Sequence, residues 1–478
     1  GDTIFALSSG HGRCGVAVIR TSGPGSRGAL QTLTSPPGLP PPRVMALRRI
    51  RDPDTAETLD RGLVVWFSGP QSFTGEDCAE LHVHGGPAVV SGVLRALGRL
   101  PGLRPAEPGE FTRRAFRRGK LDLTAAEGLG DLIRAETEAQ RRQALRQMEG
   151  ELARLYQRWS ETLTQVSGWV WPPGFHLVGL TTPGGSCHVP PSPILPPCSF
   201  PAVDATVRVL EQEISAHLQD GRRGELLRGG VHAVIAGPPN VGKSSLLNLL
   251  CQRPAAIVSP VAGTTRDVVE VALNVGGYPL VLSDTAGLRD ATDPVEQEGV
   301  SRARDRLQQA DLVLAVLDAP TVATEPVGLG VTLGSLLPPP AATTPCILVL
   351  NKVDLLRGGE GVLRDACTRG NPLPPTTLLS CKTGEGLDHL LELLGQQLAR
   401  LCGDPLAGSP SLTQSRHSLH LGDTVVALAQ YGRERRRGDL GLAAEGLRLA
   451  RRHLGRITGH VGAEDILDII FRDFCVGK

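Results

Sequence analysis

The spacing of apolar residues at the start of the chain predicts a small domain of mixed strands and helix. Short β-like runs at residues 15–20, 62–67 and 78–84 are separated by Gly/Pro turns. The stretch 88–100 instead carries its apolar positions at helical spacing. This mixture indicates an α+β domain, which we expect to span residues 1–118.

The pattern then becomes helical and is interrupted once. Residues 121–163 carry apolar positions at helical spacing, and the same spacing resumes at 203–227. Between them, residues 168–201 are rich in Pro, Gly, Ser and Cys and nearly free of charge. Such a length without periodicity is unusual in a compact protein. We therefore regard residues 166–202 as an anomalous Pro-rich segment and expect it to be poorly ordered.

Further along, short apolar runs alternate with helical segments, which predicts a mostly parallel α/β sheet in residues 229–402. Residues 412–474 return to helical spacing. Because the ends of a domain usually lie close together, we expect the α/β block to be inserted into one helical domain, made of residues 119–228 and 403–478. The predicted fold class is multidomain α/β and α+β.

Composition excludes some classes of protein. No uninterrupted apolar run reaches the ~18 residues of a spanning helix, so we expect no membrane insertion. The formal net charge of +1 does not favour bulk electrostatic binding of nucleic acid. The ten cysteines form no CxxC pair and no zinc spacing, which is typical of reduced thiols. Only five of the 50 basic residues are lysines, which indicates that those lysines occupy sites where a compact ammonium matters.

A phosphate-binding loop is predicted after the apolar run 231–236. The sequence Gly237-Pro-Pro-Asn-Val-Gly-Lys-Ser ends at Lys243 and Ser244 and leads into a helical stretch, which is the context that such a loop requires. Its glycines let backbone amides face the phosphates, Lys243 reaches the β and γ oxygens, and Ser244 offers a hydroxyl to Mg²⁺.

Three further motifs follow in the order of a GTPase. Asp284-Thr-Ala-Gly ends an apolar run, where the carboxylate can hold Mg²⁺ through water. Asn351-Lys-Val-Asp ends another, and Asp354 can accept two hydrogen bonds from guanine that adenine cannot offer. Ser380-Cys-Lys completes the base pocket. The predicted GTP-binding residues are Asn240, Val241, Gly242, Lys243, Ser244, Ser245, Thr265, Asp284, Thr285, Ala286, Gly287, Asn351, Lys352, Asp354, Ser380, Cys381 and Lys382.

The residue that usually orients the attacking water is absent. Leu288 occupies the position at which Ras-like proteins carry a glutamine. Asn240 and Glu296 are the candidates for positioning the attacking water and neutralising charge in the transition state. Upstream, Gly263-Thr-Thr-Arg-Asp provides Thr265 as a second hydroxyl ligand of Mg²⁺.

With these motifs, the chain resembles the MnmE (TrmE) family of tRNA-modification GTPases. The loop Gly-x-Pro-Asn-x-Gly-Lys-Ser-Ser, the Gly-Thr-Thr-Arg-Asp motif and Asp-Thr-Ala-Gly-Leu carry the first part of the resemblance. Motifs near both ends make it specific, namely Asp2-Thr-Ile, Ser72-Phe-Thr-Gly-Glu-Asp, His84-Gly-Gly-Pro, Pro108-Gly-Glu-Phe-Thr, Gly119-Lys-Leu-Asp-Leu and Phe474-Cys-Val-Gly-Lys. The resemblance covers nearly the whole chain, and the arginine-rich composition is more similar to mitochondrial members.

The resemblance implies a homodimeric, mitochondrial GTPase that acts at C5 of the wobble uridine of tRNA with an FAD-dependent MnmG (GidA)-type partner. It also implies an N-terminal domain that binds 5-formyl-tetrahydrofolate, or a related one-carbon folate, through Arg20, Glu80, Lys120 and Lys478. Cationic and carboxylate side chains suit the glutamate tail and polar pterin of a folate. Ordinary structural charges are the alternative interpretation of these four residues.

Three further roles follow from the same resemblance. Potassium would do the electrostatic work of an arginine finger when two G domains meet. Glu296 matches the position that orients the attacking water. Cys475 matches an essential near-terminal cysteine, with a small buried packing residue as the alternative. The implied potassium ligands are Asn240, Ser259, Val261 and Thr264.

Two other functions stay open. A regulatory GTPase of ribosome assembly, acting as an RNA-binding switch, would share the Asn-containing loop and the apolar residue at Leu288. A nucleotide-dependent dimerising scaffold with negligible turnover is the second. The ribosome-assembly hypothesis gives no reason for the N-terminal domain or for Cys475. The chain itself departs from the family pattern in residues 166–202, and it carries His11 and Cys14 where the family tends to have Pro and Gly.

Overall fold

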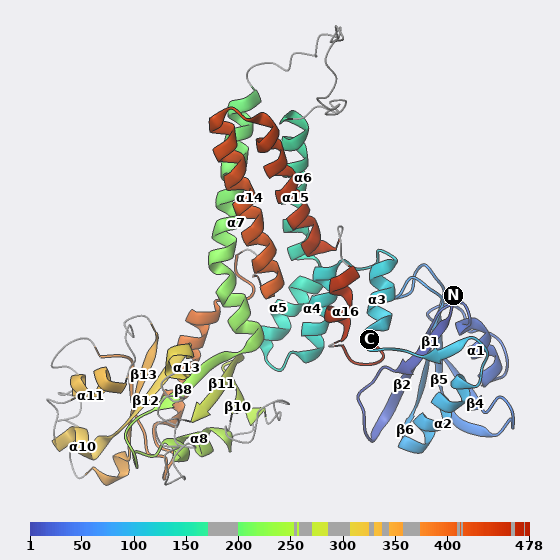
Figure 1. Ribbon diagram of the computed structural model, residues 1–478. Coiled ribbons are helices and arrows are strands. Elements are labelled where there is room, and N and C mark those ends of the chain that lie inside the picture. Colours follow the sequence, from blue (N-terminus) through green and yellow to red (C-terminus); the bar gives the residue numbers. More distant parts are fainter. Residues whose placement is uncertain are drawn as a thin grey trace, which may run out of the picture. The chain divides into compact units, whose positions relative to one another are not determined.

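The chain forms two compact units in a computed structural model (Figure 1). The first unit comprises residues 1–130, 147–203 and 427–478, and the second comprises residues 131–146 and 204–426. The structure describes residues 1–170, 199–252, 256–257, 270–284, 306–324, 329–336, 344–356, 373–408, 412, 414–459, 464–472 and 474–478.

A seven-stranded sheet forms the N-terminal part of the first unit, in the order β3-β4-β5-β6-β2-β1-β7. Neighbouring strands are antiparallel, except for the parallel pair β1 and β7. The strands are β1 (Thr3–Leu7), β2 (Cys14–Ser22), β3 (Thr34–Ser35), β4 (Ala46–Arg51), β5 (Thr58–Phe67), β6 (Cys78–Gly85) and β7 (Leu103–Pro105).

Helices α1 (Ser26–Leu33) and α2 (Pro87–Gly98) pack against one face of this sheet. The core there contains Ile19, Leu81 and Leu97, all buried. Because successive side chains of a strand point to opposite faces, the residues between these core positions lie on the other face of the sheet. That face carries the polar residues of strands β2 and β6.

The last residues of the chain pack against the helices that follow the sheet. Helix α3 (Glu110–Arg117) is followed by α4 (Leu123–Arg134), and the chain ends after α16 (Glu464–Arg472). Leu123 and Ala126 form a buried cluster with Leu467, Phe471 and Phe474. This apolar contact holds the start of the C-terminal tail, residues 474–478, against the rest of the first unit.

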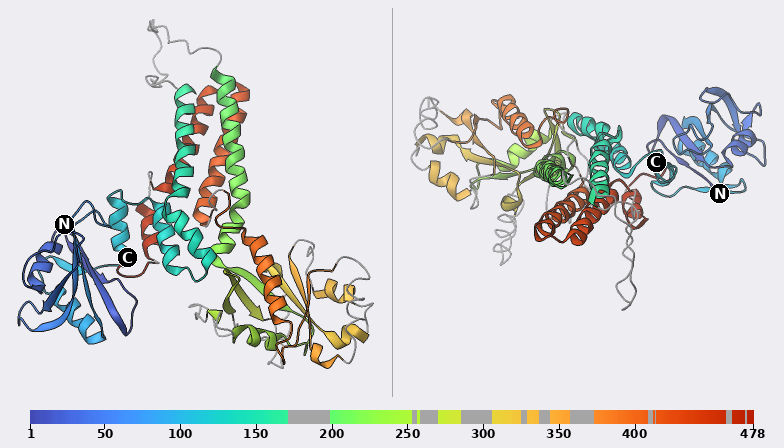
Figure 2. Two further views of the ribbon diagram at one scale, coloured as in Figure 1. Left: turned by 180° about the vertical axis from the view of Figure 1, so that it is seen from behind. Right: turned by 90° about the horizontal axis from the view of Figure 1, so that it is seen from above.

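Two long helices of the first unit, α6 (Glu151–Val170) and α15 (Leu440–Thr458), lie side by side (Figure 2). Asp439 caps α15, because its carboxylate accepts a hydrogen bond from the Leu442 amide at 2.9 Å. Apolar residues at helical spacing form the contact. The buried positions include Leu152, Tyr156, Trp159 and Leu163 on α6 and Ala443, Leu447, Ala450, Leu454 and Ile457 on α15.

The sheet of the second unit is mostly parallel, in the order β14-β13-β12-β8-β11-β10-β9. Strands β14, β13, β12, β8 and β11 run parallel to their neighbours, whereas β10 is antiparallel to both β11 and β9. The strands are β8 (Val231–Ala236), β9 (Ala256–Ile257), β10 (Glu270–Val275), β11 (Tyr278–Asp284), β12 (Leu312–Asp318), β13 (Cys346–Asn351) and β14 (Thr376–Leu378).

Helices cover both faces of this sheet, which is why its central strands are continuous apolar runs. Leu314 and Val316 of β12 share one core with α8 (Lys243–Cys251) and α13 (Leu387–Cys402). Ala315 and Leu317 face the other core, with α10 (Ala319–Thr324) and α11 (Leu329–Leu336). The unit also contains most of α5 (Glu138–Met148), most of α7 (Ser199–Gly229), the short helix η3 (Val353–Leu355) and the first half of α14 (Ser415–Arg437).

The predicted fold class, multidomain α/β and α+β, is confirmed by the mostly parallel sheet of the second unit and the mostly antiparallel sheet of the first. The exact domain boundaries at residues 118, 228 and 402 stay predictions. Most of the anomalous segment 166–202 lies outside the described residues, since α6 is described to Val170 and α7 from Ser199. In the part of the chain that the structure describes, no helix combines the length and the apolar character needed to cross a bilayer.

Candidate functional site

Polar side chains gather at one edge of the second sheet. The carboxyl ends of the parallel strands meet at that edge, where ligands of α/β folds usually bind. Strand register pairs Asp284 of β11 with Ile235 of β8, and Asp318 of β12 with Asn351 of β13. The loop that follows β8 begins at the same edge.

The loop between β8 and α8 has the backbone of a phosphate cradle. Asn240 and Gly242 both have positive φ, at 64° and 98°. A Cβ at Gly242 would collide with the Asn351 side chain, so only glycine fits there. Lys243 is buried, and its ammonium donates to the carbonyls of Gly237 and Pro238 at 2.9 and 2.7 Å. The loop therefore holds this ammonium against its own backbone, where a phosphate would lie.

Asn351 connects the phosphate loop to the base-binding loop. Its side-chain amide donates to the Val241 carbonyl at 2.8 Å, and its carbonyl oxygen accepts from the Cys381 amide at 3.1 Å. Asn351 is buried, so these bonds fix the spacing between the two loops. Burial also raises the pKa of the Cys381 thiol to about 11, which keeps the thiol protonated at neutral pH.

Side chains of the Asn351-Lys-Val-Asp and Ser380-Cys-Lys motifs hold the predicted base-binding loop in place. The Ser380 hydroxyl donates to Asp354 Oδ1 at 2.7 Å and accepts from the Thr383 amide at 3.2 Å. Lys352 adopts the left-handed conformation, with φ at 66°, and its Nζ lies 3.1 Å from Asp318 Oδ2. Asp318 is a functional candidate that the motif search missed, although its place at the end of an apolar run is a signal that could have found it.

Two residues of the described part are predicted to hold Mg²⁺, Ser244 directly and Asp284 through water. Ser244 is exposed in the first turn of α8, and the backbone of Asp284 ends strand β11. Hydroxyl and carboxylate oxygens are the ligands that Mg²⁺ prefers. Two other predicted nucleotide-binding residues are exposed, Ser245 in α8 and Lys382 in the turn that follows β14. The predicted residues outside the described part of the chain are Ser259, Val261, Thr264, Thr265, Thr285, Ala286, Gly287 and Glu296.

A second group of charged residues lies on the open face of the first sheet. Arg20 of β2 and Glu80 of β6 are register partners, and the Arg20 guanidinium contacts Glu80 Oε1 through Nε and Nη2 at 3.0 and 2.9 Å. His82 Nε2 lies 3.2 Å from the other Glu80 oxygen. Two aromatic rings flank the guanidinium, those of Phe73 at 5.6 Å and Phe111 at 5.9 Å.

The C-terminal tail contributes to this second group. Val476 forms a β-bridge with Pro108, and the Gly477 carbonyl accepts from the Ser8 hydroxyl at 3.0 Å. Lys478 is half-buried, and its pKa is lowered by that burial and by the nearby charge of Arg20. Glu80 and Cys475 act in the opposite direction on this pKa. Lys478 thus lies in the electrostatic neighbourhood of the Arg20–Glu80 pair, and Cys475 lies in that of Lys478.

The fourth predicted folate residue, Lys120, lies beside this group rather than in it. Its Nζ donates to the Pro70 carbonyl at 3.1 Å, on the loop that also carries Phe73. Cys475 is exposed, so the interpretation of this cysteine as a buried packing residue is wrong. His82, Phe73 and Phe111 were missed, although the alternation along β6 places His82 on the face of Glu80.

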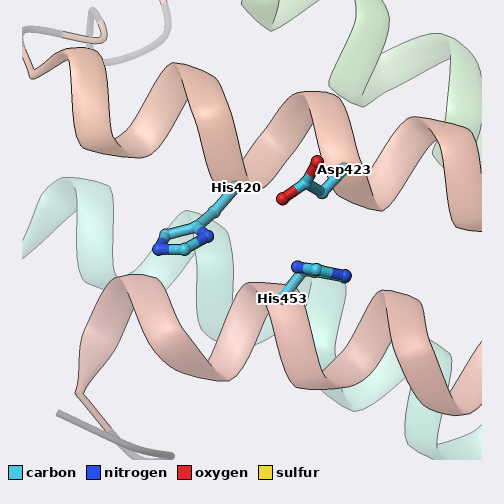
Figure 3. A group of neighbouring side chains, drawn as sticks. All are labelled: His420, Asp423 and His453. Carbon is cyan, nitrogen blue, oxygen red and sulfur yellow. The ribbon is translucent and has the colours of Figure 1, made fainter.

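Three more titratable side chains are drawn in Figure 3. His420 and Asp423 are one turn apart on α14, and His453 is on α15. The first two belong to the second unit and His453 to the first. We assign no ligand to them.

Family models match three parts of the chain. Residues 3–120 match the N-terminus of GTP-binding protein TrmE, residues 123–170 match the MnmE helical domain, and residues 232–352 match a 50S ribosome-binding GTPase.

Relatives match along the whole chain. The human mitochondrial 5-taurinomethyluridine-[tRNA] synthase subunit GTPB3 is 55% identical over 483 residues, covering 100% of this chain and 94% of the relative. The tRNA modification GTPase MnmE of Parvibaculum lavamentivorans is 48% identical over 479 residues, covering 100% of both. A solved structure of an Era variant from Aquifex aeolicus, bound to GDP and aluminium fluoride, is 27% identical with a TM-score of 0.29, covering 41% of this chain and 66% of Era.

Proposed function

The chain belongs to the MnmE (TrmE) family of tRNA-modification GTPases, and we propose that it couples potassium-activated GTP hydrolysis to modification at C5 of the wobble uridine of mitochondrial tRNA. The observation that carries the proposal is the presence of two sites in one chain. One is the strand-edge nucleotide site, and the other is the Arg20–Glu80 pair with Lys478 and Cys475 beside it.

In the nucleotide site, each group of residues has one task. Lys243 and the loop amides hold the phosphates, and Asp354 selects guanine through its two acceptor oxygens. Ser244 and Thr265 would bind Mg²⁺ directly and Asp284 through water. When bound, that ion neutralises charge on the phosphate oxygens. The Ser380 hydroxyl keeps the Asp354 carboxylate oriented, which its 2.7 Å hydrogen bond supports.

Hydrolysis needs a second source of positive charge and a group that orients water, because Leu288 can supply neither. We propose that K⁺ supplies the charge when the G domains of a homodimer meet, and that Glu296 orients the water. The left-handed backbone of Asn240 in the phosphate loop supports its role in the potassium site. The other proposed potassium ligands are Ser259, Val261 and Thr264.

The second site would bind 5-formyl-tetrahydrofolate or a related one-carbon folate. Glu80 offers carboxylate oxygens to the N–H groups of a pterin, and Arg20 and Lys478 offer donors to carboxylates. The exposed aromatic ring of Phe73 beside Arg20 gives this site an apolar wall. Exposure of the Cys475 thiol supports a chemical role for it in uridine modification.

An FAD-dependent MnmG (GidA)-type protein is the proposed partner, and mitochondria are the proposed compartment. The relatives from human, zebrafish, rat and mouse, which are named as mitochondrial synthase subunits, support that compartment. A role in ribosome assembly has support from one family model, whose match is confined to residues 232–352. It gives no account of the matches at residues 3–120 and 123–170.

Mass spectrometry of wobble nucleosides tests this proposal. Cells that lack the protein should lose the C5 substituent, and wild-type protein should restore it. Glu80→Gln should not restore it, because the amide cannot replace a carboxylate that accepts from both a pterin and Arg20. Arg49→Gln, a matched loss of one exposed charge on the same sheet, should restore it fully. Unchanged nucleosides in cells without the protein would contradict the role in modification.

A further inference from the structure

A polar groove lies between helices α6 and α15 of the first unit, with a volume of about 540 Å³. Figures 1 and 2 show these two helices running alongside each other. The α6 wall contains Gln157, Ser160 and Thr164, and the α15 wall contains Arg448, Arg451 and Arg452. None of these residues belongs to the predicted nucleotide or folate site.

Helical spacing explains why these side chains share one groove. On α6, residues 157, 160 and 164 repeat every three or four positions, so they line one face. They lie next to the buried stripe of Tyr156 and Leu163, which packs toward α15. On α15, Arg448 and Arg452 are one turn apart and follow the buried Leu447. The polar residues therefore form the rim of the apolar contact between the helices.

The groove has an excess of positive charge. No carboxylate is among its lining residues. Arg448 is paired with Glu445, with two contacts at 2.8 and 2.7 Å. Arg451 and Arg452 are exposed, and within the described residues neither makes an ion pair. Two unpaired guanidinium groups thus face solvent beside a wall of uncharged polar residues.

We propose that this groove binds the phosphate backbone of the tRNA, an inference that rests on the proposed tRNA substrate. Guanidinium forks bind phosphate oxygens in bidentate fashion. Arg451 and Arg452 are consecutive, so they leave α15 about 100° apart around its axis and can contact different phosphates of one strand. On the α6 wall the Ser160 hydroxyl can donate to a phosphate oxygen, while Thr164 and Gln157 donate within their own helix.

An acidic protein is the other polyanion that such a groove could bind, and the lining residues favour RNA. Protein interfaces usually centre on apolar or aromatic anchors. The two large apolar groups of this groove, Tyr156 and Leu454, are buried in the helix contact and cannot serve as anchors. Exposed arginine and hydroxyl groups without an apolar anchor suit a sugar-phosphate backbone better than they suit an acidic protein.

The test compares Arg451→Gln/Arg452→Gln with wild-type protein. Binding of a fluorescent, unmodified transcript of a wobble-uridine tRNA is followed by anisotropy over a series of KCl concentrations. Loss of two charge-assisted contacts should weaken binding roughly tenfold or more. The dependence of log affinity on log salt should also become shallower by about one for each lost contact. A thermal unfolding curve for each variant verifies that it is folded.

Two further variants sharpen the comparison. Arg27→Gln/Arg49→Gln removes the same charge from exposed positions of helix α1 and strand β4, and should bind tRNA like the wild type. Arg451→Lys/Arg452→Lys keeps the charge, loses the fork, and should bind with intermediate affinity.

Each contrary result has a distinct meaning. If Arg451→Gln/Arg452→Gln binds tRNA as tightly as the wild-type protein does, the groove assignment is overturned and the proposed function still stands. If that variant binds tRNA normally but no longer binds the FAD-dependent partner, the groove is a protein interface, and the assignment to tRNA is overturned. Wild-type protein without measurable tRNA affinity at low salt would overturn both proposals.

Discussion

At the scale of single residues, the carboxylate of Asp354 is predicted to select the base that the protein binds. Asp354→Asn should weaken GTP binding by roughly tenfold to a hundredfold, because one acceptor becomes a donor that faces donors on guanine. The same variant should gain affinity for xanthosine triphosphate, whose edge carries an acceptor at the altered position. Competition binding with the two nucleotides measures both effects. Undiminished GTP affinity would contradict the assignment of Asp354 to the base.

Cys475 gives a second prediction at this scale. Cys475→Ser should leave GTP hydrolysis nearly intact and abolish tRNA modification, because the exposed thiol lies near Lys478 in the first unit, whereas the nucleotide-binding loops belong to the second unit. Glu296→Ala should slow hydrolysis and impair modification as well. Phosphate release and wobble-nucleoside content are measured for both variants. Full modification by Cys475→Ser would mean that the thiol has no chemical role.

Residue types at motif positions could be predicted from the sequence, whereas their partners could not. Asp354 and Ser380 both stand in recognisable motifs, but the hydrogen bond between them depends on how two loops fold together. The ion pair of Lys352 with Asp318 joins residues 34 positions apart and has no local signature. The left-handed backbone of Lys352 could not be predicted from the sequence either, since lysine has no preference for that conformation.

At the scale of elements, helix α7 contains a buried histidine that makes stability depend on pH. Burial lowers the pKa of His217 to about 4, and nearby His417 lowers it while Asp220 opposes the change. The unfolded chain, with a histidine pKa of ~6.5, therefore binds more protons between these values. Stability from neutral His217 is complete above pH ~6.5 and is lost as the pH falls toward 4.

Replacing that histidine should remove part of the acid sensitivity. Between pH 7 and 4 the native protein should lose on the order of 3 kcal/mol through His217 alone. His217→Gln should lose correspondingly less over the same interval, even if it is less stable at pH 7. Urea unfolding of both proteins at the two pH values measures the difference. Equal losses in the two proteins would mean that His217 is not the group that titrates.

Strong elements were predictable because their patterns are local. The run 231–236 matches β8, and the runs 62–67 and 78–84 fall within β5 and β6. The pairing of the tail with the N-terminal domain was available only from the resemblance. Val476 bridges Pro108 across most of the chain, and no periodicity encodes such a contact.

At the scale of the whole molecule, hydrolysis should depend on which monovalent cation is present. Turnover should be clearly higher in potassium than in sodium at one ionic strength, because Leu288 cannot orient water and no arginine finger is predicted. Steady-state phosphate release in KCl and NaCl measures this. Equal rates in the two salts would refute potassium activation. Asn240→Ala should reduce the difference between the salts.

The half-buried ammonium of Lys478 allows the group around Arg20 and Glu80 to be probed by covalent labelling. A lowered pKa leaves more of this amine neutral, and therefore nucleophilic, than an ordinary lysine at mildly alkaline pH. Among the five lysines, Lys243 is buried with its ammonium bonded to two carbonyls, so an acylating reagent should react with it slowly. Limited acylation followed by peptide mapping should then mark Lys478 early. A one-carbon folate that binds there should protect it, while guanine nucleotides should not.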